Sequence, residues 1–485
     1  MQNLNESLQA KYPHLELAIL PLSQVQKDNE SKRIDSEFAK KIHLKVKNQL
    51  LFLNSLYLKD IVIFNARYTQ PEYNQNSNLK IINSQYLRNE FIDYENAKTG
   101  YGKIVPKNAV LVNSTGIGTL GRVNINLLNL DFSIDSHINV LILNKESEIK
   151  PCYLMVFLQS KYGQFQIERY YSGSSGQIEI YPKDFNNFLI PKFPQDFQLE
   201  IEKLVKQSHE ALEDSKRLYK EAQELLYKEL ELDFKNPLES LLKSSLQAKK
   251  ANELAIINDI SKKYPHLNIS VRPLSKSLHK SGRLDSEYYQ SKYDLMETKI
   301  KDYKGGYCKL QPSEIKDSNF TPKAQEKYRY IELANIGNNG NISEPLEDFG
   351  ENLPTRARRK VKTDDFIMSS IEGSLASCAL ITPEFDNCLV STGFYVLNSS
   401  ELNGETLLVL FKCEFFQEYL RKFPSGTILT AISKDELQNI LIPKINPATQ
   451  EQIALKIQKS FTLRAKSKDL LQNAKMRLEN AIENG

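Results

Sequence analysis

The segment Gly116–Gly121 reads GIGTLG and has the spacing of a dinucleotide-binding fingerprint. In that fingerprint the glycines follow a strand and open a helix, whose amides and dipole bind a pyrophosphate. Here the run Arg122–Ile125 follows the glycines, and its β-branched residues favour a second strand. We therefore interpret the segment as the glycine turn of a β-hairpin and not as a nucleotide site.

Cations gather in two parts of the sequence, where they could contact the phosphates of DNA. Arg and Lys pair with phosphates, and Arg also reads guanine edges bidentately. A dense cluster of five cations in seven residues precedes a predicted strand: Arg356, Arg358, Arg359, Lys360 and Lys362. A looser set lies in the first half of the chain: Lys98, Lys103, Lys107 and Arg122. The alternative interpretation of the dense cluster is a solvated run of surface charge.

Two glycine–serine loops with neighbouring cations occupy matching places in the chain. Such loops can approach a phosphate through their backbone amides. The first is YYSGSSGQ, Tyr170–Gln177, and the second is KFPSGT, Lys422–Thr427. We add these loop residues to the candidate DNA contacts: Arg169, Ser174, Ser175, Arg421 and Lys422. Simple connectors are the alternative.

The sequence offers no motif of a catalytic site. It has no NPPY- or DPPF-like tetrapeptide for a flipped base, no FxGxG loop for S-adenosylmethionine and no Walker P-loop. His14 and His266 stand at equivalent places in P-H-L turns, which favours a structural role. Five cysteines without CxxC spacing predict buried thiols and no zinc site. We therefore expect no catalytic residue, no metal and no cofactor in this chain.

The chain is an internal duplication with an offset of 252 residues. KYPHL begins at Lys11 and at Lys263, and LIPK begins at Leu189 and at Leu441. RIDSEF, which begins at Arg33, has the counterpart RLDSEY in the second copy, where it begins at Arg283. Matches at both ends of a unit, with looser middles, indicate two copies of one domain.

Each copy ends in a long stretch with helical periodicity. The first carries a heptad seam, in steps of four and three, formed by Phe197, Ile201, Leu204, Ser208, Ala211, Ser215, Leu218, Ala222 and Leu225. The second continues the phase with Ile453, Ile457, Ser460, Leu471, Ala474, Leu478 and Ala481. Residues 196–235 hold 11 acidic and 7 basic side chains, and residues 451–485 hold 4 and 7. Opposite net charges suit two helices that pair with each other; an ordinary amphipathic surface helix is the alternative.

The body of each copy mixes short strands with helices. The runs 109–114, 138–143 and 365–370 are apolar and β-branched, which predicts strands. Short helices are expected at Pro151–Phe165 and Glu405–Leu420. The fold class is therefore α+β, with two tandem domains, each followed by a long helix, and the two helices paired as an antiparallel coiled coil. We expect domains at 1–195 and 251–446, with one long central helix and a connector at 196–250 and a final long helix at 447–485.

Composition and the N-terminal sequence indicate where such a chain works. Of its 485 residues 40% are hydrophobic and 26% charged, and the net charge is only +4. The start, MQNLNESLQA, lacks the layout of a secretory signal, and no apolar run approaches the ~18 residues that span a bilayer. We expect a cytoplasmic protein with no membrane partner.

The whole chain resembles the specificity subunits of type I restriction–modification enzymes. The residues that carry the resemblance are the segments Val110–Val123, Tyr330–Ser343, Phe366–Ile381 and Pro447–Ser460, together with the glycine–serine loops and the LIPK strings. The resemblance implies two target-recognition domains, each reading one half of a split double-stranded DNA target. Methyltransferase subunits would dock on the helices and carry S-adenosylmethionine, and a restriction subunit that uses ATP and Mg²⁺ would join them.

Some alternatives stay open at this point. RIDSEF-like boxes also occur in recognition domains of fused methyltransferase–nuclease enzymes, so the chain could be the recognition subunit of a two-protein type II system. A nuclease or methyltransferase with undetected motifs, or a coiled-coil scaffold that does not bind DNA, are more distant alternatives. The residues expected in the helix pairing and partner interface are Ile201, Leu204, Leu218, Leu225, Ile453, Ile457, Leu471 and Leu478.

Overall fold

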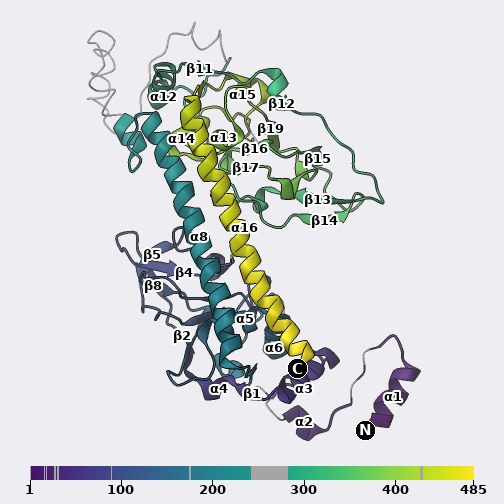
Figure 1. The fold of residues 1–485 in the computed structure, drawn as a ribbon. Coiled ribbons are helices and arrows are strands. Elements are labelled where there is room, and N and C mark those ends of the chain that lie inside the picture. The colour runs from purple at the N-terminus through teal and green to yellow at the C-terminus, as the bar shows by residue number, and fades with distance from the viewer. Residues whose placement is uncertain are drawn as a thin grey trace. The chain divides into compact units, whose positions relative to one another are not determined.

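The computed structural model describes residues 2–15, 17, 19–26, 29, 32–88, 90–173, 176–241, 282–426 and 430–485. The chain divides into two compact units (Figure 1). Unit 1 contains residues 1–213 and 463–485, and unit 2 contains residues 214–462. The second copy of KYPHL, from Lys263, lies outside the described residues.

Unit 1 carries a body of short helices and strands. Its helices are α1 Gln2–Lys11, α2 Leu22–Gln26, α3 Lys41–Phe52, α4 Leu58–Ile61, α5 Pro151–Gln159, α6 Lys161–Tyr170 and α7 Pro182–Phe185. Its strands are β1 Ser55–Tyr57, β2 Val62–Arg67, β3 Glu72–Tyr73, β4 Lys80–Ile82, β5 Lys98–Tyr101, β6 Val110–Asn113, β7 Val123–Ile125, β8 Phe132–Ile134, β9 Ile138–Leu143 and β10 Leu189–Pro191.

Unit 2 carries the same kinds of element in a similar order. Its short helices are α12 Ser291–Lys301, α13 Gly404–Lys412, α14 Glu414–Leu420 and α15 Lys434–Asn439. Its strands are β11 Tyr307–Cys308, β12 Ile315–Lys316, β13 Lys327–Ile331, β14 Leu346–Phe349, β15 Ala357–Lys360, β16 Phe366–Ser369, β17 Cys378–Leu380, β18 Leu389–Ser391, β19 Phe394–Leu397 and β20 Ile442–Pro443.

The strand order of the first sheet repeats from one unit to the other, and that of the second sheet repeats in three of its four strands. Unit 1 has an antiparallel sheet β2-β9-β6-β7, and unit 2 has the corresponding sheet β12-β19-β16-β17. A second sheet, β3-β5-β4-β8 in unit 1 and β14-β13-β18-β15 in unit 2, holds one parallel pair in each case, β4 with β8 and β13 with β18. The fourth strand differs, since β3 pairs with β5 in unit 1 and β15 pairs with β18 in unit 2. The pairs β1–β10 and β11–β20 complete the correspondence. The predicted duplication is therefore confirmed at the level of topology.

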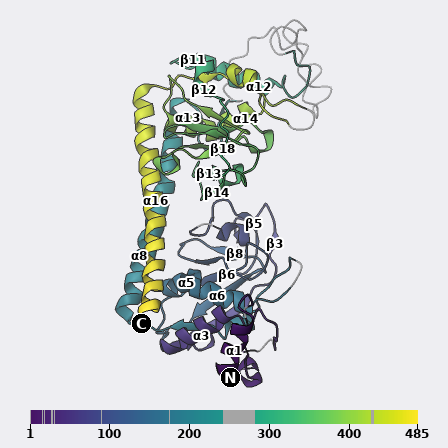
Figure 2. The same ribbon diagram turned by 90° about the vertical axis from the view of Figure 1, so that its right-hand side faces the viewer.

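The central strands β6 and β16 of the first sheets are buried on both faces, which explains their continuous apolar runs. On β6 of unit 1, Val110 and Val112 join the core beneath α5, whereas Leu111 joins a second core against the other sheet. On β16 of unit 2, Phe366 and Met368 face α13 and α14, and Ile367 faces the opposite way. Figure 2 shows α5 and α6 beside β6 in unit 1. The three predicted strands are confirmed as β6, β9 and β16.

Each predicted short helix is in fact two helices. Ser160 adopts an extended conformation, ends α5, and accepts the amide of Gly163 as the N-cap of α6. Cys413 is likewise extended between α13 and α14. The prediction of single helices at Pro151–Phe165 and Glu405–Leu420 was wrong. One extended residue between two helical runs leaves the hydrophobic periodicity of the sequence almost unchanged, so the break could not be seen in it.

Two long helices, α8 Gln195–Glu229 and α16 Pro447–Asn484, lie side by side within each unit (Figures 1 and 2). In unit 1 the Ser208 and Ser467 hydroxyls are 3.0 Å apart, and in unit 2 the Ser215 and Ser460 hydroxyls are 3.0 Å apart. The contact residue on α8 rises by seven, from 208 to 215, while its partner on α16 falls by seven, from 467 to 460. The pairing is therefore antiparallel. The prediction of a mixed fold with two domains and an antiparallel coiled coil is confirmed.

The seam between the helices uses the predicted residues. Ile201, Leu218, Ile453, Ile457, Leu471 and Leu478 are buried, and Leu204 and Leu225 are partly buried. The predicted charge complementarity is present in each unit, as Glu200 pairs with Arg477 at 3.3 Å and Glu221 pairs with Lys456 at 2.5 Å.

Helix α8 also buries a second row of side chains, spaced seven residues apart, that the sequence analysis did not single out. This row packs on the body of each unit and consists of Gln198, Val205, Leu212, Tyr219 and Leu226. The helix therefore has two buried faces, one toward α16 and one toward the strands and short helices.

The seam predicts a stability difference between two neighbouring residues of α16. Ile457 is fully buried, whereas Leu455 is 62% exposed. Ile457→Ala removes buried methyl groups and leaves a cavity, which costs about 2–5 kcal/mol. We expect the thermal unfolding midpoint of the unit to fall by at least about 4 °C, as measured by calorimetry. Leu455→Ala is the control and should shift it little; equal midpoints would show that Ile457 is not packed in the seam.

Candidate nucleic-acid interface

The ends of four strands meet at one edge of the first sheet in unit 1. The pairing register sets Arg67, the last residue of β2, opposite Asn139. The same register sets Asn113, the last residue of β6, opposite Ile138. The connections at residues 114–122 and 135–137 therefore leave the sheet at the same edge. We call this edge, with the loops upon it, the loop edge of unit 1.

The glycine–serine loop of unit 1 joins the other two connections at the loop edge. The amide of Gly116 donates to the carbonyl of Ile178 at 2.9 Å, and Arg67 forms an ion pair with Glu179. Thr115 Oγ1 and His137 Nδ1 are 3.0 Å apart. Three segments that are distant in sequence are thereby fixed against one another. Ser174 and Ser175, two of the predicted contacts, lie outside the described residues.

The glycine turn has the predicted hairpin geometry. Gly116, Gly118 and Gly121 have φ values of 88°, 72° and 82°, which residues with a side chain rarely adopt. The turn connects β6 to β7, and Val112 pairs with Val123 across the hairpin. No helix begins after the glycines, so the pyrophosphate arrangement is not present in this segment.

Arg122, a predicted DNA contact, holds the glycine turn in place. Its Nη1 donates to the carbonyl of Ser84 at 2.8 Å, and its Nη2 donates to the carbonyl of Gly118 at 2.9 Å. Burial, followed by the nearby charge of Arg88, lowers the pKa of Arg122. Since both terminal nitrogens bind backbone carbonyls, this structure gives Arg122 a supporting role for the turn.

The RxDSE boxes anchor the glycine–serine loops in both units. Arg33 pairs with Asp35 and donates to the carbonyls of Arg169, at 2.9 Å, and Tyr171. In unit 2, Arg283 pairs with Asp285 and donates to the carbonyls of Phe423 and Pro424, at 3.0 and 2.9 Å. The repeated box is visible in the sequence, but its contact with the loop is not, because the partners lie about 140 residues away.

Arg169 and Lys422, two predicted phosphate contacts, are buried beneath these loops, at 4% and 8% exposure. The Arg169 guanidinium lies 4.5 Å from the centre of the Phe38 ring, and the Lys422 ammonium lies 4.8 Å from that of Tyr288. Lys422 also pairs with Glu297. Cation–π contacts of this kind stabilise a packed arrangement, so both cations act in this structure as supports of the loops.

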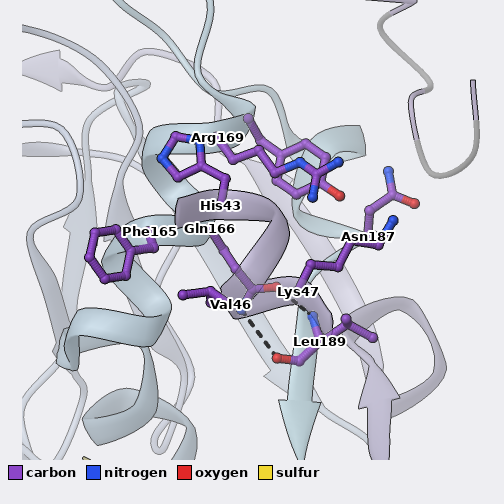
Figure 3. Close-up of a pocket in the computed structure, with 9 residues that line it drawn as sticks. His43, Val46, Lys47, Phe165, Gln166, Arg169, Asn187 and Leu189 are labelled. Atoms are coloured by element: carbon purple, nitrogen blue, oxygen red, sulfur yellow. Dashed lines mark hydrogen bonds between the residues drawn. The ribbon is translucent and has the colours of Figure 1, made fainter. Parts of the chain in front are cut away.

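A small cavity lies next to Arg169 in unit 1 (Figure 3). It is lined by side chains from α3, from α6 and from the segment before β10, among them His43, Gln166 and Asn187. Burial lowers the pKa of His43. The cavity has a volume of about 10 Å³, which is room for about one water molecule. It is too small for a nucleotide or a base.

Unit 2 has a loop edge of the same construction. Its connections 370–377 and 391–393 meet where the Ser370 amide donates to the Gly393 carbonyl at 2.9 Å. The Glu372 amide donates to the Thr430 carbonyl at 3.1 Å and joins the second glycine–serine loop to them. Lys412 supports the turn by donating to the carbonyls of Gly337 and Ala376, at 2.7 and 2.8 Å, and burial lowers its pKa. Nothing in the sequence around Lys412 indicated this role.

The dense basic cluster forms a strand of its own, β15, and does not make a compact patch. Arg356 is exposed at the loop edge, where its carbonyl accepts the amide of Thr392 at 2.9 Å. Lys362 is exposed near the opposite end of the strand, about 20 Å away at ~3.3 Å per residue. Two cations of the cluster therefore lie at different ends of the sheet.

The middle cations of the cluster point to different faces of β15. Arg358 donates to the carbonyl of Thr355 at 2.9 Å, and Lys360 lies over the ring of Phe320. Arg359 lies on the other face, over Tyr395, and donates to the carbonyl of Phe394, and burial lowers its pKa.

The remaining predicted contacts are exposed. Lys98 begins β5 opposite Ile81, and the Lys103 ammonium lies 4.8 Å from the ring centre of Tyr68, the residue after Arg67. Arg421 is exposed and pairs with Glu418 at 3.1 Å.

In the described ranges, no group of three or more His, Cys, Asp or Glu side chains could hold a metal ion. No helix in the same ranges is long and apolar enough to cross a membrane. The five cysteines are free thiols, and burial raises the pKa of Cys152 to about 12.

Residues 54–221 match the family model described as the type I restriction modification DNA specificity domain. This segment belongs to that family. It spans the body of unit 1 from β1 to α7 and much of α8. The resemblance found in the sequence is therefore confirmed for residues 54–221, and the loop edge of unit 1 belongs to a DNA specificity domain.

Solved structures similar to the chain carry related descriptions. The crystal structure of a type I restriction–modification system S subunit from M. genitalium is 13% identical, with a TM-score of 0.41, and the match covers 88% of this chain and 94% of that one. The HsdS subunit from Thermoanaerobacter tengcongensis is 14% identical, with a TM-score of 0.25 and coverages of 88% and 94%. A structure described by complex assembly and conformational transition of the type I system is 16% identical, with a TM-score of 0.27 and coverages of 88% and 95%. No curated protein matches the chain.

The support that Arg122 gives to the glycine turn can be measured by hydrogen exchange. Arg122→Ala removes two hydrogen bonds to backbone carbonyls, each contributing about 0.5–1.5 kcal/mol. We expect the amides of residues 116–121 to exchange roughly tenfold faster. Arg88→Ala, at an exposed neighbouring cation, is the control. Unchanged exchange in the Arg122 variant would show that the turn is fixed by its other contacts.

Proposed function

We propose that the chain is the sequence-specific DNA-recognition subunit of a type I restriction–modification enzyme, and that it catalyses no reaction by itself. The observation that carries the proposal is the family membership of residues 54–221. Unit 2 repeats the strand order of the first sheet and the loop edge of that domain. Two domains that share a fold in one chain support a bipartite target, of which each unit reads one half.

The differences between the two loop edges support two different half-sites. The turn of unit 1 has the sequence GIGTLG, whereas that of unit 2 has IEGSLAS. The supporting cations also differ, with Arg122 in one unit and Lys412 in the other. The framework is therefore repeated while the residues at its surface change, as expected of a scaffold that carries function on its loops.

The outward faces of the long helices support docking of methyltransferase subunits. The predicted seam residues pack between α8 and α16. A methyltransferase subunit would therefore contact the solvent-exposed faces of these helices. Large apolar side chains are exposed there, namely Leu199, Leu455 and Met476. We propose that these subunits bring S-adenosylmethionine, and that a restriction subunit which uses ATP and Mg²⁺ joins through them, in the cytoplasm.

The proposed division of labour is tested with the purified chain. Alone, it should neither methylate nor cleave DNA when S-adenosylmethionine, ATP and Mg²⁺ are supplied. With its methyltransferase partner, it should direct methyl transfer to a specific sequence. Transfer of labelled methyl groups to DNA by the single chain would contradict the proposal, as would sequence-independent methylation by the complex.

The geometry of β15 predicts different roles for the two ends of the basic cluster. Arg356→Ala should make the slope of log affinity against log salt shallower by about 0.9, the value for one lost phosphate contact. Lys362→Ala, at the far end of the strand, is the matched control and should leave the slope unchanged. Fluorescence anisotropy of the complex across a salt series measures both. Equal slopes for the two variants would remove Arg356 from the DNA contacts.

The paired helices predict the spacing of the half-sites. Seven residues inserted into α8 after Ala211, and seven into α16 before Arg464, keep the heptad phase and lengthen each helix by about 10.5 Å. At ~3.4 Å per base pair, the gap in the selected target should grow by about three base pairs, with both half-sites unchanged. Selection of bound duplexes from a random library measures the gap. A folded variant that selects the original gap would show that the helices do not set it.

A further inference from the structure

We propose that Ile117 and Glu372, at the tips of the two hairpin turns, each read one base pair of the target in the major groove. The inference rests on the proposed function and deepens it, because it names one specificity-determining residue in each unit. Ile117 would contact the methyl group of a thymine. Glu372 would accept a hydrogen bond from the amino group of a cytosine.

The two residues occupy the same place in the duplicated fold. Each stands six positions before the second strand of its hairpin, which begins at Val123 in unit 1 and at Cys378 in unit 2. Each is followed directly by a glycine, Gly118 or Gly373. Three residues after each tip, Leu120 or Leu375 packs into the core of its unit.

The backbone of each turn is fixed by hydrogen bonds to the rest of its unit, while the side chain at its tip is exposed. In unit 1, the Gly116 amide is fixed to the glycine–serine loop and the Gly118 carbonyl to Arg122. In unit 2, the amide of Glu372 and the carbonyl of Ala376 are held in the same manner. A side chain on a fixed backbone loses little conformational freedom on binding, which favours recognition.

The surroundings of the tips suit close approach to a groove. Ile117 is 68% exposed, and Glu372 is also exposed. A Cβ added at Gly118 or at Gly373 would meet no atom within 4 Å, so nothing covers the tip on that side. A glycine beside the reading residue also lets the backbone come near the bases.

The chemistry of each tip points to a different base. An apolar side chain recognises the C5 methyl group of thymine, the one apolar feature of the major groove. A carboxylate near DNA is repelled by phosphates, so it is favoured only where it accepts a hydrogen bond from a base, and Glu and Asp accept from cytosine N4. The two copies therefore carry different reading groups on the same frame.

Selection of bound duplexes from a random library, with the chain assembled with its methyltransferase partner, tests the inference. Ile117→Gln should change the preferred base at one position of one half-site. Glu372→Gln should change one position of the other half-site. At each position, discrimination against the wrong base should fall about 10- to 100-fold. Ile117→Thr keeps a methyl group and should retain the original base.

Matched controls are available away from the loop edges. Ile63 is also 68% exposed but lies near the opposite end of β2, and Glu384 is exposed after β17. Ile63→Gln and Glu384→Gln should select the wild-type site. If the tip variants also select the wild-type site, or weaken binding equally for all sequences, the inference is wrong while the proposed function stands. If the wild-type complex selects no sequence, the proposed function fails and the inference fails with it.

Discussion

Helix α8 has to bury two rows of side chains at once, and this constraint fixes the geometry of the rest of each unit. In unit 1, Ser208 faces α16 while Val205 and Leu212 pack on the body. In unit 2, Ser215 faces α16 while Tyr219 and Leu226 pack on the body. Helix α8 cannot rotate or slide without breaking contacts on both of these faces, so its register with α16 and its attachment to each body are determined together.

The polar residues at the centre of the seam make that register specific. The pairing register sets Arg464 opposite Ala211 in unit 1, and burial lowers the pKa of Arg464 despite the nearby carboxylates of Glu90 and Asp93. A slip of one heptad would bring Arg464 opposite Leu204 and leave the Ser215 hydroxyl opposite Ile453. Buried polar groups lower the stability of a coiled coil but select one register over others.

Patterns within one stretch of sequence predicted much of the fold. The runs around Val110 and Ile138, the glycine turn and the heptad seam are local, because strand alternation, turn chemistry and helix periodicity involve near neighbours. The supports of the loop edges could not be found in this way. Arg169 stacks on Phe38, and Lys412 binds the carbonyl of Gly337, across separations of 131 and 75 residues. Arg169 stands next to a glycine–serine loop in the sequence and was therefore predicted to contact phosphate, whereas in the fold it lies in α6 and supports that loop through its contact with Phe38.

The central claim is that the chain directs a methyltransferase to a target in two parts. Sequencing of modified bases in the DNA of cells that express the chain with its methyltransferase subunits tests it most directly. The account predicts methylation at one motif made of two different short sequences, separated by a gap of fixed length and unspecified sequence. Methylation at a contiguous motif, or a pattern that stays the same when this chain is deleted, would contradict it.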